Sequence, residues 1–257
     1  RAYFERFNPV DYDPGEWAAI AEDAGMKYVV LTSKHHEGFC LWDSAYTDYK
    51  VTNTPYGKDL LKPFADAFRA EGLKVGFYYS LIDWHHPEFP IDVHHPLRNH
   101  PNVKALNENR DITKYATYVH NQVKELLTDF DPAILWCDFS YPDREYKGMP
   151  GKGREDWQSE DLVAMIRDIK PDIILNNRLD LPDAADIYTP EQWQPTEWVK
   201  VDGEPVVWET CQTFSGSWGY HRDEKTWKSP GQLIRMLVNT VARGGNLLMN
   251  VGPTALG

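Results

Sequence analysis

Asp138 is the acidic side chain with the most constrained setting in this sequence, because it ends the short apolar run Ala133 to Asp138. A carboxylate at the end of a buried strand is held rigidly enough to act as a nucleophile. A second carboxyl, whose protonated form apolar neighbours favour, can then protonate a leaving oxygen. These are the two groups that glycoside hydrolysis uses.

The second carboxyl has two leading candidates. Glu191 has aromatic neighbours in a long loop, and Glu209 follows a tryptophan in an apolar run. Glu209 is expected to be better buried, whereas Glu191 is better placed to move. The residues alone leave the choice open, and they do not exclude Glu37 or Asp83.

Polar and aromatic side chains of the kinds that bind sugars accompany these carboxyls. His35 and His36 can act as neutral donors to sugar hydroxyls, Arg178 can serve similarly, and Trp218 is a candidate apolar wall. Each residue taken alone is equally compatible with binding a sugar and with a structural role, such as a salt bridge or a place in the core. A set of such residues near two carboxyls favours a sugar site.

Three adjacent histidine pairs allow a metal site as a competing hypothesis, since barrel hydrolases can hold zinc with histidines at strand ends. The pairs are His35-His36, His85-His86 and His94-His95. Neighbouring residues in a strand point to opposite faces, so one pair supplies one inward ligand. Neither HxH nor HExxH occurs. We therefore expect no metal and no other cofactor.

The polar residues recur where short apolar runs stop. The strand-like runs are Tyr28 to Thr32, Leu73 to Tyr79, Ala133 to Asp138, Ile173 to Asn177, Val206 to Thr210 and Leu247 to Val251. Parallel strands of a barrel bring their carboxyl ends to one face, where barrel enzymes carry their active sites. The sequence therefore predicts a single convergent pocket.

Amphipathic helical stretches separate these runs. They are Pro14 to Ala24, Asp59 to Glu71, Ile112 to Phe130, Ser159 to Ile169 and Pro230 to Ala242. Such alternation favours parallel strands joined by crossover helices, in an open sheet or a (β/α) barrel. No GxGxxG or GKS/GKT phosphate loop follows a strand, which disfavours a nucleotide site. Asp83 to Asn107 and Asp180 to Glu204 are expected to be long functional loops.

Length and charge limit the number of domains and the kinds of partner that the chain can have. The 257 residues suit one α/β barrel domain, and 27 Lys and Arg against 39 Asp and Glu give a net charge of −12. That sign argues against nucleic acid and anionic membranes as partners. No apolar run approaches the roughly 20 residues of a membrane span. The three cysteines are far apart, which excludes a disulfide framework and CxxC zinc spacing.

Six ordered blocks resemble the α-L-fucosidases of glycoside hydrolase family 29. They are KHHEGFCLW at 34–42, GFYYS at 76–80, LWCD at 135–138, WETC at 208–211, SWGY at 217–220 and GGNLLMNVGP at 244–253. The resemblance covers nearly the whole chain. It implies a (β/α) TIM-like barrel that removes terminal α-L-fucose with retention, through a covalent fucosyl-enzyme, from a fucosylated oligosaccharide or glycoconjugate.

The resemblance also assigns roles to individual residues. Asp138 becomes the nucleophile, and Glu191, a dozen or so residues beyond the arginine, becomes the acid/base with Glu209 as runner-up and sugar contact. The residues expected to bind the substrate are His35, His36, Trp42, Tyr78, Arg178, Glu209 and Trp218.

The chain also departs from the family pattern. No first strand with a Phe-x-x-His-Trp-Gly type block precedes Arg1, and no β-sandwich follows Gly257. Six strands are recognisable where a closed barrel needs eight, so either weak strands escape the analysis or the barrel is incomplete. We expect one catalytic domain over 1–257, as part of a longer enzyme or as a fragment.

Three functional hypotheses therefore stand. The first is an α-L-fucosidase, the second a fucose-binding barrel with impaired catalysis, and the third a metal-dependent barrel hydrolase. We expect a periplasmic or secreted location rather than a cytoplasmic one. The fucosyl linkage and the oligomeric state stay open, with a homo-oligomer among the alternatives.

Overall fold

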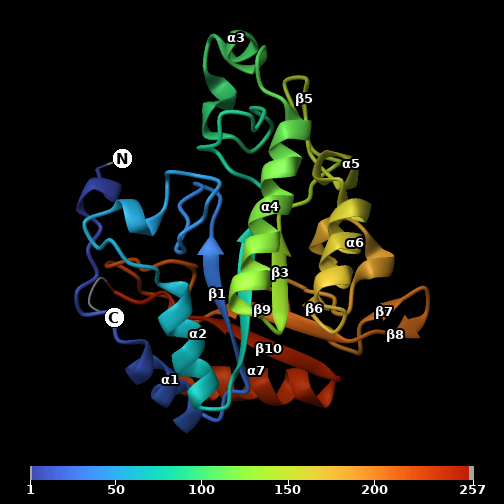
Figure 1. Ribbon diagram of the computed structural model, residues 1–257. Helices are drawn as coiled ribbons and strands as arrows, with labels where there is room; N and C mark the ends of the chain where they lie inside the picture. Colours follow the sequence, from blue (N-terminus) through green and yellow to red (C-terminus); the bar gives the residue numbers. More distant parts are fainter. Residues whose placement is uncertain (1, 255–257) are drawn as a thin grey trace. The chain divides into compact units, whose positions relative to one another are not determined.

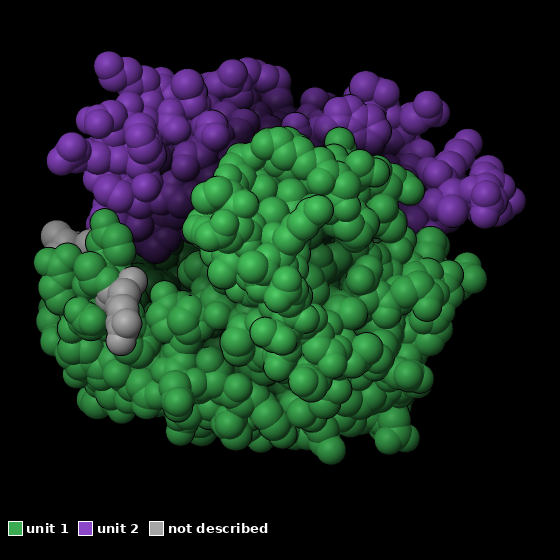
Figure 2. Space-filling view, turned by 90° about the horizontal axis from the view of Figure 1, so that it is seen from above, with its two compact units in different colours: residues 1–184 green, residues 185–257 purple. Residues whose placement is uncertain are grey.

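The structure is a computed structural model that describes residues 2–254. The chain divides into two compact units, Arg1–Ala184 and Ala185–Gly257, coloured separately in Figure 2. Each unit is built from parallel strands and the helices that connect them (Figure 1).

The first unit contains a four-stranded parallel sheet. Its strands, in spatial order, are β1 (Tyr28–Lys34), β2 (Lys74–Ser80), β3 (Ile134–Asp138) and β6 (Ile174–Leu175). The connecting helices are α1 (Pro14–Asp23), α2 (Leu61–Ala70), α4 (Ile112–Phe130) and α6 (Ser159–Ile169). Sequence order and spatial order agree, as crossover connections between neighbouring parallel strands require.

Capping residues explain where the helices begin. Asp13 accepts hydrogen bonds from the amides of Gly15 and Glu16 at the start of α1, and Asp111 does the same for Thr113 and Lys114 at α4. Such caps satisfy amides that have no partner inside the helix. The bounds predicted for α4 and α6 are confirmed at both ends, and α1 and α2 fall within their predicted ranges.

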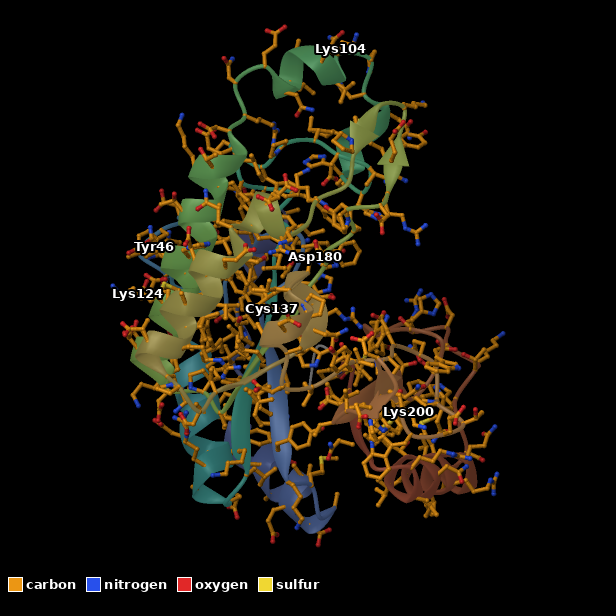
Figure 3. All side chains as sticks on the ribbon, turned by 90° about the vertical axis from the view of Figure 1, so that its right-hand side faces the viewer. Tyr46, Lys104, Lys124, Cys137, Asp180 and Lys200 are labelled. Atoms are coloured by element: carbon orange, nitrogen blue, oxygen red, sulfur yellow. The ribbon has the colours of Figure 1, made fainter. Side chains whose placement is uncertain are left out.

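The core of the first unit lies between the sheet and these helices. Cys137 on β3 is buried there, whereas Lys124 on α4 lies on the outer face of its helix (Figure 3). Strands β2 and β3 approach closely at Gly76, where an added Cβ would lie 2.7 Å from the Cβ of Ile134. Glycine at this position therefore permits the spacing of the two strands.

The second unit is built on a parallel strand pair, β9 (Trp208–Thr213) and β10 (Gly245–Asn250), joined by α7 (Pro230–Ala242). Ser229 and Gln232 form a reciprocal capping box at the start of α7. Residues 188–191 run parallel to β9 and pair with it at Tyr188 and Glu191. The sequence did not predict this pairing, because the paired stretch is short and contains a proline.

The loops carry short elements. These are α3 (Val103–Asn107), α5 (Arg154–Trp157), the strand pairs β4 (Glu145–Tyr146) with β5 (Met149–Pro150) and β7 (Lys200–Val201) with β8 (Glu204–Pro205), and 3-10 turns at Phe4–Arg6, Val51–Asn53, Pro96–Asn99, Asn177–Leu179 and Pro182–Ala184. Across residues 2–254, none of the helices combines the length and the apolar composition needed to cross a membrane.

Candidate active site

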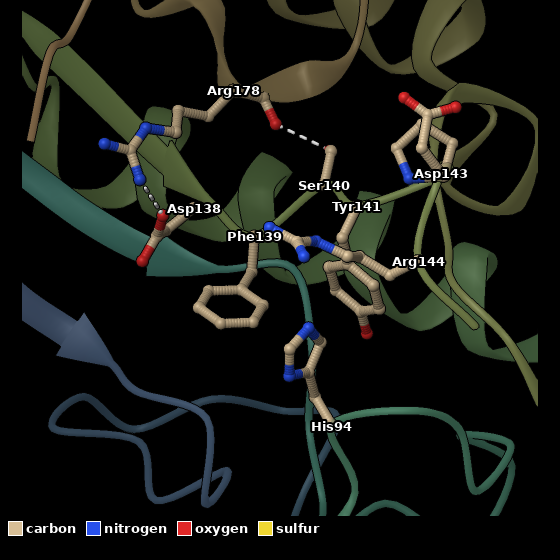
Figure 4. A pocket seen from close by; sticks show the side chains of 9 residues that line it. His94, Asp138, Phe139, Ser140, Tyr141, Asp143, Arg144 and Arg178 are labelled. Atoms are coloured by element: carbon tan, nitrogen blue, oxygen red, sulfur yellow. Dashed lines mark hydrogen bonds and ion pairs between the residues drawn. The ribbon is translucent and has the colours of Figure 1, made fainter. Parts of the chain in front are cut away.

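Asp138 ends β3 and is 8% exposed, so its carboxylate lies just below the surface at the carboxyl end of the sheet. Tyr78, near the end of β2, donates a hydrogen bond of 2.6 Å from its hydroxyl to Oδ2. Arg178, from the turn after β6, donates one of 2.8 Å from Nη1 to Oδ1 (Figure 4). One donor and one full positive charge stabilise the ionised carboxylate, which a nucleophile requires.

An arc of contacting side chains runs from Arg178 through aromatic and imidazole rings to Phe139, and two of its members, Arg178 and Tyr78, contact this carboxylate. Its neighbouring members touch in sequence: Arg178 over Trp136 at 4.7 Å, Trp136 with Tyr78 at 5.7 Å, Tyr78 with His35 at 5.5 Å, His35 with His36 at 3.9 Å, and His36 with Phe139 at 4.5 Å. The arc presents hydrogen-bonding edges and aromatic faces together, which is the composition of a site for a flat, hydroxylated ligand.

The tautomer of His36 follows from its hydrogen bonds. Nδ1 of His36 lies 2.7 Å from the hydroxyl of Ser80, and that hydroxyl donates its only hydrogen to the carbonyl oxygen of Ile82 at 2.8 Å. Ser80 must therefore accept the hydrogen bond from Nδ1. Burial lowers the pKa of His36 from 6.5 to about 3, so the ring is neutral at pH 7. Nε2 is left as an acceptor for a ligand hydroxyl.

Replacing Ser80 with alanine is expected to release this tautomer, because Nδ1 then loses its acceptor. In nitrogen-15 NMR at pH 7, His36 of the parent chain should be neutral and protonated at Nδ1. The Ser80→Ala variant should shift towards protonation at Nε2. Ser159→Ala, which removes another buried hydroxyl bonded to a carbonyl, is the matched control and should leave the signal unchanged. A parent His36 protonated at Nε2 would contradict the assignment.

Lys34 and Asp83 form a buried ion pair, with Nζ 3.7 Å from Oδ2. Burial lowers the pKa of Lys34, and the charge of Asp83 opposes that effect. The Asp83 carboxylate also accepts hydrogen bonds from the amides of His85 and His86, and it fills the space beside Gly38, where φ is +85°. Asp83 thus joins the turn after β1 to the loop after β2. Because these structural contacts occupy its carboxylate, Asp83 is poorly suited to act as the catalytic acid.

Glu37 is exposed and pairs with His35 at 3.5 Å. Burial acts to raise the pKa of Glu37, but the hydrogen bond with His35, a backbone hydrogen bond and the charges of His35 and Lys34 together outweigh it, and the pKa is lowered overall. A general acid must hold its proton near neutral pH. Glu37 is therefore poorly suited to protonate a leaving group.

The two leading acid candidates lie on neighbouring strands of the second unit. Glu209 is 3% exposed in β9, whereas Glu191 is exposed in the segment that pairs with β9. Glu191 lies opposite Cys211, two residues beyond Glu209 along β9. As expected from the sequence, Glu209 is the better buried of the two, and both stay candidates.

The two predicted tryptophans differ in their settings. Trp218 is 42% exposed in the loop after β9, which suits an apolar wall. Trp42 is 1% exposed, and its indole nitrogen donates a hydrogen bond of 3.1 Å to Glu125. The structure places Trp42 in the core, which disfavours its expected role in substrate binding and favours a structural one.

Several residues at the site were missed by the sequence analysis. Trp136, two residues before Asp138 in β3, shares its face of the strand, a pattern that alternation in a strand could have identified. Ser80 ends a predicted strand but was given no role at the site, and Phe139 gave no signal, because its position depends on backbone conformation. Among residues 2–254, no group of three or more His, Cys, Asp or Glu side chains is placed to hold a metal ion.

A carboxylate at the end of a parallel strand, with sugar-binding side chains around it, is typical of a barrel glycoside hydrolase. A model of the alpha-L-fucosidase family matches residues 1–257. Plasma alpha-L-fucosidase of Rattus norvegicus is 32% identical over 257 residues, covering 95% of this chain and 50% of that protein. The chain belongs to the alpha-L-fucosidase family, and it spans about half the length of this curated relative.

Solved structures agree with this assignment. Alpha-L-fucosidase isoenzyme 1 from Paenibacillus thiaminolyticus is similar with a TM-score of 0.92 and 48% identity, over 100% of this chain and 61% of that chain. A trapped covalent intermediate of a GH29 alpha-L-fucosidase from Bacteroides thetaiotaomicron is similar with a TM-score of 0.81 and 30% identity. The similarity covers 100% of this chain and 59% of that chain. The predicted (β/α) TIM-like barrel class is confirmed, although the strand pairings within residues 2–254 do not close a barrel.

Proposed function

We propose that this chain carries the catalytic site of a retaining glycoside hydrolase that removes terminal α-L-fucose from glycans. The observation that carries the proposal is the Asp138 carboxylate, which Tyr78 and Arg178 hold at the strand ends in a chain of the alpha-L-fucosidase family. The covalent intermediate trapped in the Bacteroides thetaiotaomicron relative supports a mechanism with retention.

In the first step, an oxygen of Asp138 attacks the anomeric carbon of the fucoside while Glu191 gives its proton to the glycosidic oxygen. The bond between the anomeric carbon and that oxygen breaks, and an ester to Asp138 forms. Arg178 and Tyr78 hold the carboxylate in one orientation, and this reduces the entropy that must be lost to reach the attacking geometry. The mechanism requires the two carboxyl groups to lie about 5 Å apart.

In the second step, Glu191, now ionised, takes a proton from water as that water attacks the anomeric carbon. The ester to Asp138 breaks, and α-L-fucose leaves with its original configuration. During both steps, His36 accepts a hydrogen bond from a fucose hydroxyl at Nε2, and His35 provides a further contact. Trp218 supplies the apolar wall for the methyl group, and Glu209 a sugar contact.

The natural substrate in this proposal is a fucosylated oligosaccharide or glycoconjugate, met in the periplasm or outside the cell. The plasma location in the name of the Rattus norvegicus relative supports a secreted site. Residues 1–257 form one catalytic domain in this proposal. The similarity of the Paenibacillus thiaminolyticus enzyme over 100% of the chain supports that grouping.

The test is hydrolysis of 4-nitrophenyl α-L-fucoside, followed by proton NMR of the sugar released. The first anomer formed should be α-L-fucose, before mutarotation mixes the two forms. Appearance of the β-anomer first would contradict the covalent mechanism, because a single displacement inverts the configuration.

Two further assays on the same protein distinguish this proposal from the two competing functions. Binding of fucose in a calorimeter without any hydrolysis would identify a fucose-binding barrel with impaired catalysis. Loss of hydrolysis in excess chelator would identify a metal-dependent hydrolase. The proposal expects full activity with chelator present.

A further inference from the structure

Strand β6 leaves the sheet before its neighbour β3 reaches Asp138. The pairing of the two strands ends at Leu135 with Leu175, three residues before the carboxylate. Successive peptide groups of a strand bond to opposite sides, and the carbonyl oxygen of Asp138 accepts from the amide of Leu81, on the β2 side. Cys137 therefore directs its N–H and C=O to the other side, where β6 has already ended.

The side chain of Asn176 takes the place of the missing strand residue. Its Oδ1 accepts from the amide of Cys137 at 3.1 Å, and its Nδ2 donates to the carbonyl oxygen of Cys137 at 2.8 Å. These partners fix the orientation of the carboxamide, because an amide N–H only donates and a carbonyl only accepts. Asn176 is 2% exposed, so water does not compete for the two bonds. One buried side chain thus extends the sheet past the end of β6.

This replacement has consequences on both sides of the catalytic carboxylate. On β3, the carbonyl that Asn176 holds belongs to the peptide group directly before Asp138, so it fixes the backbone from which that side chain projects. After β6, the chain can enter the 3-10 turn Asn177–Leu179, which brings Arg178 to Oδ1 of Asp138 at 2.8 Å. Ser140 donates to the carbonyl oxygen of Arg178 at 2.7 Å and so holds the same turn (Figure 4).

We propose that Asn176 is a positioning residue for the reaction, which acts on the nucleophile through the peptide group between Cys137 and Asp138. Tyr78 and Arg178 hold the carboxylate itself, whereas Asn176 holds the backbone that carries it. A reacting group displaced by about 1 Å can lose roughly a hundredfold in rate. This inference rests on the proposed function, because it takes Asp138 as the nucleophile.

The test is a double-mutant cycle between Asn176 and Asp138. Asn176→Leu keeps the approximate volume of the side chain and removes both hydrogen bonds. With Asp138 in place, it should lower kcat/KM for 4-nitrophenyl α-L-fucoside roughly a hundredfold. The inhibition constant of L-fucose should stay within about twofold, because the side chains that bind the sugar are unchanged. In the Asp138→Gly background, where azide replaces the carboxylate, the same substitution should change the azide-dependent rate by less than about threefold.

Asn107→Leu is the matched control. Asn107 makes the same pair of bonds to another backbone residue: its Oδ1 accepts from the amide of Ile91 at 2.7 Å, and its Nδ2 donates to the carbonyl oxygen of Ile91 at 2.9 Å. This variant should lower the midpoint of thermal unfolding, as Asn176→Leu does, and leave kcat/KM unchanged. Asn176→Ala removes the same two bonds without adding branches, and it should repeat the result of Asn176→Leu.

Each other outcome contradicts the positioning role. An equal loss in the Asp138→Gly background would mean that Asn176 does not act through Asp138. An unchanged kcat/KM with Asp138 in place would mean that the nucleophile does not need this support. Failure of both Asn176 variants to fold would assign the residue to folding alone. A parent chain that hydrolyses no fucoside, or an Asp138→Gly variant with the parent rate, would instead refute the proposed function, and the positioning role with it.

Discussion

Replacing Asp138 with glycine is expected to lower kcat/KM for 4-nitrophenyl α-L-fucoside by about 10⁴-fold, which corresponds to roughly 5 kcal/mol of barrier. The reason is that the attacking oxygen is removed while the residues that bind the sugar stay. Addition of azide should restore part of the rate and yield β-L-fucosyl azide, because the small anion attacks from the side that Asp138 occupied. The measurement is the initial rate of nitrophenol release, with NMR of the product.

The control for this variant is Asp172→Ala, which removes an exposed carboxylate that pairs with Lys170. It should keep the parent rate, and the midpoint of thermal unfolding should show that both variants are folded. Turnover by Asp138→Gly within about tenfold of the parent would be too small a loss for a nucleophile, since tenfold corresponds to only about 1.4 kcal/mol. The catalytic role would then belong to another carboxylate.

The second large effect is expected for Glu191→Ala. Without the acid, kcat/KM for a fucosyl disaccharide should fall about 10³-fold, because a sugar alkoxide is a poor leaving group unless it is protonated. The loss should be much smaller for the nitrophenyl substrate, whose leaving group needs little help. Azide should rescue the variant and give α-L-fucosyl azide, since the intermediate on Asp138 still forms.

Glu209→Ala is the matched comparison, because Glu209 lies on the adjacent strand and is the rival for the same role. It should lose activity on both substrates alike and should gain nothing from azide, as expected for a residue that binds the sugar. If azide rescues Glu209→Ala better than Glu191→Ala, the acid/base role moves to Glu209.

Much of the fold follows from local chemistry in the sequence. The prediction for α7 agrees with the structure at both ends, because Ser229 and Gln232 mark its start and two glycines follow its end. Strand β6 is shorter than predicted, since only Ile174 and Leu175 pair with β3. Residues 188–191, which pair with β9, were predicted to be part of a long loop. Short strands that contain proline are defined by their partners rather than by their own sequence.

The candidate site was predictable to the extent that strand ends converge. That argument alone expected Tyr78, Asp138 and Arg178 to meet, and in the structure they do. It did not reach Phe139, because nothing in the sequence around it indicates a positive φ at a phenylalanine. The resemblance also grouped Trp42, which is buried in the core, with the exposed Trp218. Burial of a single aromatic side chain depends on packing between distant segments.

The most direct test of the central claim, that Asp138 forms a covalent bond to fucose, is mass spectrometry after incubation with 2-deoxy-2-fluoro-fucosyl fluoride. The fluorine at position 2 destabilises the transition states, and the fluoride leaves readily, so the ester accumulates. The account predicts one fluorofucosyl group per chain, on the peptide that contains Asp138. A label on any other carboxylate, or hydrolysis of fucosides by a chain that takes up no label, would contradict it.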